Sequence, residues 1–230
     1  MNALEPHAPS RLHFHQELAH LQDDVLVLGS MVEKATLRAV DALRQQDVPA
    51  ARVIDAEDAL INRKRFELEE ATMLLMATQQ PMASDLRRLA AILHIVTDLE
   101  RMGDYAAGIA RICVAIGDEP LIKPLIDIPR MAEIATSMLH EALAAFVARD
   151  VAAAEAIARR DDEVDALYQQ VYRELLALML ANPRTIDQAT HLLWAAHNLE
   201  RVADRVQNIC ERIGFMVTGR MQELSRGPLG

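Results

Sequence analysis

Acidic side chains recur in pairs one helical turn apart, and this spacing carries the clearest chemical potential in the sequence. Glu100 precedes Asp104 by four residues, and Glu200 precedes Asp204 by the same interval. On an α-helix this spacing places both carboxylates on one face. Like charges so placed cost a helix roughly 0.2–0.5 kcal/mol, so stability alone does not favour them. The arginine after each glutamate, Arg101 in the first pair, is expected to point elsewhere and leave the pair unneutralised.

Two further acidic residues interrupt apolar helix stripes. Asp161 occupies an apolar position with Asp165 one turn on, and Asp58 does the same with Asn62 one turn on. A carboxylate on a packed stripe is costly unless it is hydrogen-bonded, paired or bound to a metal. Clustered oxygen ligands attract cations such as Mg, Ca, Mn or Fe. The sequence therefore predicts two metal sites, one from Asp58, Asn62, Glu100 and Asp104 and one from Asp161, Asp165, Glu200 and Asp204.

A solvated helix face is the alternative explanation for these acids. In that case Arg63, Lys64, Arg159 or Arg160 would pair with them in water. His197, three residues before Glu200, is a further possible ligand, although a histidine on a helix face is more often a plain surface or core residue. The repetition of the whole acidic arrangement in both halves is the reason to consider a metal.

Long helices must position these residues. Aromatic residues make up only 3% of the chain, and 8 Gly and 9 Pro provide little turn material for an all-β fold. Cys113 and Cys210 fall on apolar stripes whose spacing alternates between four and three, as on the packed face of a helix bundle. They are expected to be buried thiols in a cytoplasmic protein. The pattern predicts six helices, at 11–46, 50–79, 82–116, 128–148, 151–181 and 185–217.

The two halves of the chain repeat each other. The segment 47–51 resembles 150–154, and Leu-Glu-Arg at 99–101 recurs at 199–201. We therefore predict an all-α fold of two tandem three-helix bundles related by internal duplication. Consecutive helices with short loops pack antiparallel, so each acidic pair should meet acids of the neighbouring helix. The predicted units are an N-terminal tail 1–10, a first repeat 11–117, a linker 118–129, a second repeat 130–218 and a C-terminal tail 219–230.

Charge and motif content argue against several classes of function. The net charge of −10, without a basic stripe, argues against nucleic-acid binding and favours cations or basic partner surfaces. The sequence contains no uncharged apolar run near the ~20 residues of a membrane span, and residues 1–10 do not resemble a signal peptide, so a membrane is expected only through partners. It also lacks a Gly-rich phosphate loop and a Gly-x-Ser-x-Gly motif, so we expect no enzyme.

A ferritin-like dimetal carboxylate enzyme is the main rival interpretation. Such a site requires a Glu-x-x-His motif on each of two helices, and this sequence does not carry that pair. A helical adaptor whose acids bind no metal is a second rival.

Two segments resemble the signature of the PhoU family of phosphate-uptake regulatory proteins. They are Gln80-Pro81-Met82-Ala83-Ser84-Asp85-Leu86-Arg87 and Asp98-Leu99-Glu100-Arg101-Met102-Gly103-Asp104. The likeness covers about residues 12–217. The second half departs from the signature, with Asp187-Gln188-Ala189 in place of Asp-Leu-Arg and Ala203 in place of Gly103.

The resemblance implies metal clusters, with iron first and Zn, Mn, Mg or Ca as alternatives. The family's acidic metal motifs fall at Glu100/Asp104 and Glu200/Asp204, with Asp161/Asp165 on the neighbouring helix. Asn62 replaces a carboxylate beside Asp58, which implies a weaker first site.

The resemblance also implies a negative regulator of phosphate uptake and of phosphate-starvation genes. Its expected partners are the ATPase subunit of a phosphate ABC transporter and a phosphate sensor histidine kinase, and a homodimer is expected. An accessory protein of another phosphate transporter is the alternative within the family.

Overall fold

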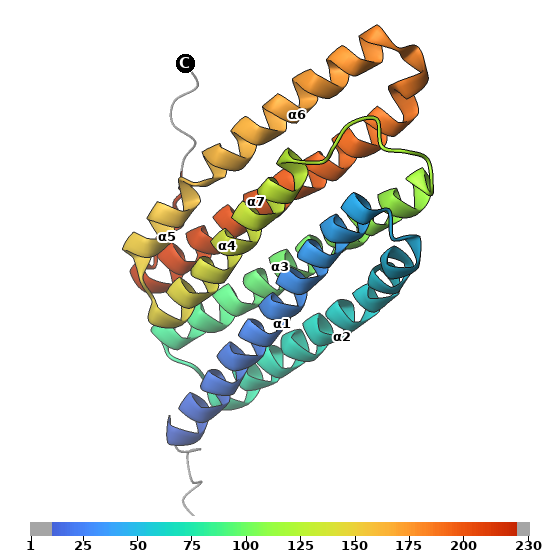
Figure 1. Ribbon diagram of the computed structural model, residues 1–230. Helices are drawn as coiled ribbons and strands as arrows, with labels where there is room; N and C mark the ends of the chain where they lie inside the picture. Colours follow the sequence, from blue (N-terminus) through green and yellow to red (C-terminus); the bar gives the residue numbers. More distant parts are fainter. Residues whose placement is uncertain (1–10, 225–230) are drawn as a thin grey trace, which may run out of the picture.

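A computed structural model describes residues 11–224, and all regular secondary structure in this range is helical (Figure 1). The predicted tail 1–10 and residues 225–230 lie outside the described residues. The predicted all-α fold of two three-helix units is confirmed. The elements are α1 (Arg11–Gln45), α2 (Val48–Gln79), α3 (Ala83–Ile116), α4 (Asp127–Ala148), α5 (Val151–Ala158), α6 (Asp161–Ala181), the 3₁₀ turn η1 (Pro183–Thr185) and α7 (Ile186–Thr218).

Equivalent helices in the two halves begin with the same cap. Asp47 Oδ1 accepts a hydrogen bond from the backbone N–H of Ala50 at 2.9 Å, and Asp150 Oδ1 accepts one from Ala153 at 3.0 Å. Such a side chain satisfies an amide that has no partner in the first helical turn. Pro49 lies within the first turn of α2, where its missing N–H costs nothing, so α2 begins slightly earlier than predicted.

The predicted helix 151–181 is interrupted, which is the main departure from the expected boundaries. The backbone N–H of Arg160 donates to the carbonyl of Ile157 at 2.9 Å, and this three-residue turn breaks the α-helical ladder. Neither Pro nor Gly marks the break, so sequence periodicity did not indicate it. Asp161 consequently stands in the first turn of α6. An acid is favoured there by the helix dipole, whether or not a metal is present.

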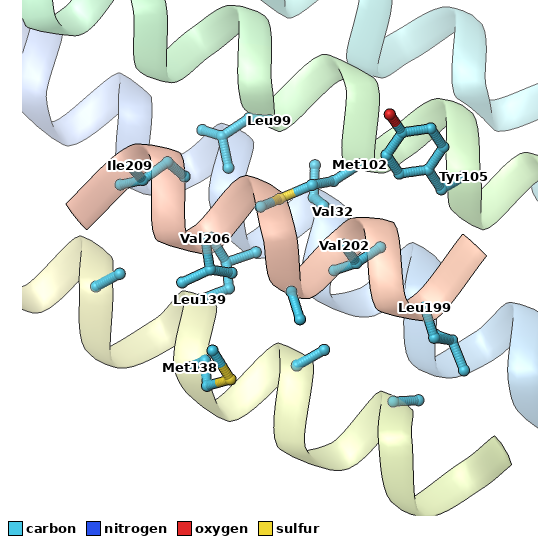
Figure 2. Packing of buried hydrophobic residues seen from close by; sticks show 14 of the residues in the cluster. Val32, Leu99, Met102, Tyr105, Met138, Leu139, Leu199, Val202, Val206 and Ile209 are labelled. Atoms are coloured by element: carbon cyan, nitrogen blue, oxygen red, sulfur yellow. The ribbon is translucent and has the colours of Figure 1, made fainter. Parts of the chain in front are cut away.

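α3 and α7 pack against each other at the centre of the molecule (Figure 1). α1 and α2 pack on α3, whereas α4, α5 and α6 pack on α7, and α1 also contacts α4. Figure 2 shows Leu99 and Met102 of α3 close to Val202 and Val206 of α7, and all four are fully buried. The predicted stripes are buried throughout, namely Ile92, Val96, Leu99, Gly103, Ala106, Ala110 and Cys113 on α3, and Leu192, Ala196, Leu199, Ala203, Val206, Cys210 and Ile213 on α7.

The contact between α3 and α7 follows the internal repeat. The side chain of Asn208 hydrogen-bonds the carboxylate of Asp98. At the other end, a Cβ placed on Gly108 would lie 3.0 Å from Asn198 Nδ2. Residues 98 and 108 of α3 thus face residues 208 and 198 of α7. The two pairs are exchanged by the sequence offset of 100 between the halves, which is the relation expected of a pseudo-twofold.

The connection between the halves is fixed by a buried glutamine of α7. Gln188 Oε1 accepts a hydrogen bond from the backbone N–H of Ile122 at 2.6 Å, and its Nε2 donates to the carbonyl of Pro120 at 3.1 Å. α4 begins at Asp127, close to the start at residue 128 predicted for this helix, and Pro129 fits within its first turn. The connection is therefore attached to the second unit by Gln188.

The C-terminal segment 219–224 contacts α7 rather than forming the loose tail expected for it. The backbone N–H of Leu224 donates to Glu211 Oε1 at 3.2 Å, and Gln207 Nε2 donates to the carbonyl of Leu224 at 2.6 Å.

Among residues 11–224, α4 is the one helix long and apolar enough to span a membrane by length and composition. Its most apolar window is 56% buried against the other helices, and the core helices of water-soluble bundles pass the same test. We therefore assign α4 to the packed interior, where Phe146 is fully buried.

Candidate metal centre

The first predicted site lies where α2 approaches α3 at a glycine. A Cβ placed on Gly103 would lie 3.0 Å from Ile61 Cγ2 and 3.4 Å from Asp58 Oδ1. The absent side chain thus allows Asp58 to lie beside the turn of α3 that carries Glu100 and Asp104. A cavity of about 180 Å³ adjoins Asp58 and Gly103, so a small ion has room to reach the carboxylate.

Electrostatic repulsion connects the three acids of this site. Burial raises the pKa of Asp58, and the nearby negative charge of Asp104 raises it further, against the opposing effect of Arg111. Burial also raises the pKa of Glu100, again with a contribution from Asp104. The charged form of each carboxylate is therefore less favoured than it would be in water. A bound cation would relieve this repulsion.

One carboxylate oxygen of the site is buried and has no hydrogen-bond partner. Asp58 Oδ2 accepts a hydrogen bond from Asn62 Nδ2 at 2.9 Å, whereas Asp58 Oδ1 is enclosed without a donor. A buried oxygen of this kind is costly in free energy, and a metal would satisfy it. Asn62 meets Asp58 as a hydrogen-bond donor, which differs from its predicted role as an oxygen ligand.

Arginines also approach these acids, and here one expectation was wrong. Arg101 does not point elsewhere, because its Nη1 lies 3.6 Å from Asp104 Oδ2 and its Nε lies 3.8 Å from Glu100 Oε2. Arg65 Nε lies 3.7 Å from Glu100 Oε1. These distances are too long for good hydrogen bonds, so the pairs are loose. Lys64, which we considered as a neutralising partner, instead binds Asp24 at 2.7 Å.

The second predicted site lies between α6 and α7. Asp161 is 6% exposed, and Asp165, Glu200 and Asp204 are half-buried. Tyr168 lies on the face of α6 that also carries Asp161 and Asp165, and Glu200 contributes to the raised pKa of Tyr168 after burial does. The acidic face of α6 is therefore turned toward the turn of α7 that carries Glu200.

His197 takes part in the surroundings of Glu200. Its Nδ1 lies 3.2 Å from Glu200 Oε2, and its ring lies 5.9 Å from the ring of Tyr168. In the neutral form this histidine can donate to the carboxylate, as residues outside the ligand set of a metal often do.

Among residues 11–224, no three His, Cys, Asp or Glu side chains are grouped closely enough to hold a metal ion as they stand. The donor chemistry nevertheless fits a hard or borderline cation, and the enclosed Asp58 Oδ1 fits a missing ligand. The side chains of both sites would have to rotate inward to bind a cation, and Arg101 would have to move away. The metal therefore remains a prediction.

A buried acid between the two halves was missed in the sequence. Asp98 is buried on α3, and Arg205 Nη1 of α7 lies 3.2 Å from its Oδ1. Burial raises the pKa of Asp98, while Arg205 and Asn208 favour its charged form. The only sequence signal was a carboxylate at a position beside the α3 stripe, and its partner is 107 residues away.

Both cysteines are free and buried, as predicted. Burial raises the pKa of Cys210 to about 12 and also raises the pKa of Cys113. Burial thus disfavours the thiolate form of both side chains.

The raised pKa of Asp58 predicts a pH-dependent effect of Asp58→Asn in protein freed of metal by a chelator. An acid whose pKa is higher in the folded than in the unfolded state lowers the free energy of unfolding at neutral pH. This loss of stability disappears as the pH falls through the folded pKa toward the unfolded value of ~4. We expect Asp58→Asn to raise the free energy of unfolding at pH 7 by roughly 0.5 kcal/mol. This gain should shrink as the pH approaches ~4. Urea unfolding across this pH range measures both effects.

Asp41→Asn is the matched control of opposite sign. Hydrogen bonds from Arg44 and Gln45 lower the pKa of Asp41, so this substitution should destabilise the protein at neutral pH and have a diminishing effect in acid. Equal responses of the two variants at every pH would contradict the electrostatic description of Asp58.

Both halves of the chain match a known protein family. The family model of the PhoU domain matches the chain twice, at residues 25–113 and 128–213. A protein named phosphate-specific transport system accessory protein PhoU homolog, from Clostridium acetobutylicum, is 36% identical over 213 residues, covering 92% of this chain and 97% of that protein. A homolog with the same name from Rhizobium meliloti is 34% identical, and the match covers 96% of this chain and 93% of that protein.

Two crystal structures share the fold. PhoU from Pseudomonas aeruginosa superposes with a TM-score of 0.85 at 33% identity, covering 90% of this chain and 100% of that one. The phosphate transport system regulatory protein PhoU from Streptococcus pneumoniae gives the same TM-score and identity, covering 91% and 99%.

Proposed function

The chain belongs to the PhoU family, and from this premise we propose that it is an accessory protein of a phosphate-specific transport system that restrains phosphate uptake and phosphate-starvation signalling. The observation that carries the proposal is the extent of the likeness. It runs through both repeats. The match to each relative named as an accessory protein covers nearly the full length of this chain and of that relative. The proposed activity is binding and regulation, and it requires no catalysis.

The proposed mechanism is that of an adaptor on the cytoplasmic side of the membrane. We infer that it joins the ATPase subunit of the phosphate ABC transporter to a phosphate sensor histidine kinase and holds the kinase in a repressing state when phosphate is plentiful. The fold supports this role, because the two repeats share one core through α3 and α7 and form a continuous scaffold. A homodimer would present two such scaffolds.

The proposed function includes a metal ion at each repeat. Asp58, Glu100 and Asp104 would hold it in the first repeat, and Asp161, Asp165, Glu200 and Asp204 in the second. The ion would neutralise the clustered carboxylates and join neighbouring helices. Asn62 would contribute through its amide oxygen only after giving up its hydrogen bond to Asp58.

Deletion of the gene tests the proposed function in the organism that encodes it. In phosphate-rich medium the deletion should raise the expression of phosphate-starvation genes toward the level of starved cells, because the repressing link is lost. A transcriptional reporter measures this, and complementation with the wild-type gene is the control. Unchanged reporter expression would reject the regulatory role. Altered phosphate uptake with an unchanged reporter would identify an accessory protein of another phosphate transporter.

A further inference from the structure

Two hollows follow each other along the α3 side of α7, between the two repeats. The larger, about 480 Å³, is lined by Trp194, His191 and His197 of α7 and by Gly108 and Arg111 of α3, among others. The smaller, about 240 Å³, is lined by polar residues of α7 alone, including Arg201 and Arg205. Trp194 precedes Arg201 by seven residues and Arg201 precedes Arg205 by four, so the three side chains lie on one helix face. We call the two hollows together the α3–α7 groove.

The larger hollow offers an exposed aromatic anchor point. Trp194 is the single tryptophan of the chain, and it is 58% exposed. Its ring meets His191 edge-on at 6.3 Å between centroids, and Ile112 and Ala115 complete an apolar floor. Gly108 allows the close approach of Asn198 of α7 on the α3 side of the hollow. Exposed tryptophans beside a hollow are typical of binding hot spots, because they give a large contact area at low entropic cost.

The lining of the groove is richer in arginine than in carboxylates, unlike the chain as a whole. No carboxylate lines the larger hollow, whereas Arg111 does. In the smaller hollow Arg201 and Arg205 accompany a single acid, Asp204. The chain as a whole carries a net charge of −10. The arginines of the groove favour an acidic ligand over a basic one.

The arginines are held in place by neighbours that leave them facing the groove. Arg205 donates to Asp98 Oδ1 at 3.2 Å, and the guanidinium of Arg201 lies 4.4 Å from the centroid of the Tyr105 ring. Arg111 pairs with Asp55 at 2.6 Å, but both side chains are exposed, so this pair is weak and exchangeable. An incoming carboxylate can thus approach Arg201 and Arg111 without disturbing the core.

We propose that the α3–α7 groove binds an acidic polypeptide segment of a partner protein. The segment places one aromatic or large aliphatic side chain against Trp194 and its carboxylates on Arg201 and Arg111. The inference rests on the proposed function, for which it supplies a partner-binding surface.

A binding assay with defined polymers tests the chemistry of the ligand. The probe is a fluorescein-labelled random copolymer of glutamate and tyrosine, compared with labelled polyglutamate and polylysine, and fluorescence anisotropy reports binding to the full-length protein. We expect the copolymer to bind most tightly, polyglutamate more weakly because it has no apolar anchor, and polylysine not at all in this groove. Added salt should weaken copolymer binding.

Substitutions locate the binding. Trp194→Ala should weaken copolymer binding about thirty-fold, as expected for a hot-spot residue. Arg201→Gln should weaken it several-fold and reduce the salt dependence. Met73→Ala, whose side chain is also 58% exposed but lies on α2, and Arg63→Gln on the same helix are the matched controls and should change nothing. Equal binding by all variants, no binding of the copolymer, or equally tight binding of polyglutamate would overturn the proposal.

The same variants separate this inference from the proposed function in cells. If the deletion derepresses the phosphate-starvation reporter and Trp194→Ala does so too, at normal protein abundance, the groove is the partner surface. If the deletion derepresses the reporter but the Trp194→Ala and Arg201→Gln proteins still repress it fully, the groove proposal fails and the regulatory role stands. If the deletion itself has no effect, the regulatory role fails irrespective of the groove.

Discussion

Leu99→Ala should lower the free energy of unfolding by about 2–5 kcal/mol, the range measured for large-to-small substitutions in protein cores. Leu99 is completely buried on α3 and lies in the core shared with α7 (Figure 2). The substitution removes apolar contacts and leaves a cavity that tightly packed helices cannot close. Native proteins are stable by only ~5–15 kcal/mol, so this loss is a large fraction of the total. Denaturant unfolding measures it, and Tm should fall by roughly 2–4 °C for each kcal/mol.

Two further substitutions make this test specific. Leu74→Ala is the surface control, because Leu74 is 65% exposed, and it should stay within about 0.5 kcal/mol of wild type. Leu199 is the repeat equivalent of Leu99 and is equally buried, so Leu199→Ala should cost a similar amount. A loss for Leu99→Ala no larger than that for Leu74→Ala would contradict the shared core.

A divalent or ferric cation should stabilise protein that has been treated with a chelator. Binding to the folded state alone adds roughly 2.7 kcal/mol when the free metal exceeds its Kd a hundred-fold. Thermal unfolding with and without iron, manganese or zinc measures the gain, and metal analysis of protein purified without chelator gives the native ion. The gain should be largest near neutral pH, because protons compete for Asp58 and Glu100, whose pKa values are raised.

Substitutions in each repeat assign the metal sites. Glu100→Gln should remove the gain from the first repeat, and the combined change of Glu200→Gln and Asp204→Asn should remove that from the second. Glu70→Gln, on the exposed side of α2, is the control and should leave the gain intact. Arg101→Gln should increase metal affinity, because Arg101 now competes for Glu100 and Asp104. If the purified protein contains no metal and its melting temperature responds to neither metal nor chelator, the metal sites are rejected and the protein is a metal-free adaptor.

The features that depend on local pattern were predictable from the sequence. The apolar stripes that carry Cys113 and Cys210 were predictable, because burial imposes a strict spacing on a packed helix. The likeness of 47–51 to 150–154 was also visible in the sequence, and it corresponds to the equivalent caps at Asp47 and Asp150.

The features that depend on tertiary contacts were not predictable. The break before Asp161 uses no Pro or Gly, so composition does not distinguish it from a continuous helix. The approach of Arg101 to Glu100 and Asp104 depends on the rotamer of a long side chain, which spacing does not fix. The partnership of Asp98 with Arg205 joins residues from different repeats and required the packing of α3 on α7 to be known.

The pairing of residue 98 with 208 and of 108 with 198 has an evolutionary consequence. In an association of two identical single-repeat chains, every substitution would appear at both ends of the contact at once, and the ends would stay alike. Fusion of the repeats into one polypeptide removes that restriction. One end of the contact carries Asp98 and Asn208, and the other carries Gly108 and Asn198. A duplicated gene can in this way specialise two sides of one ancestral surface for two different tasks.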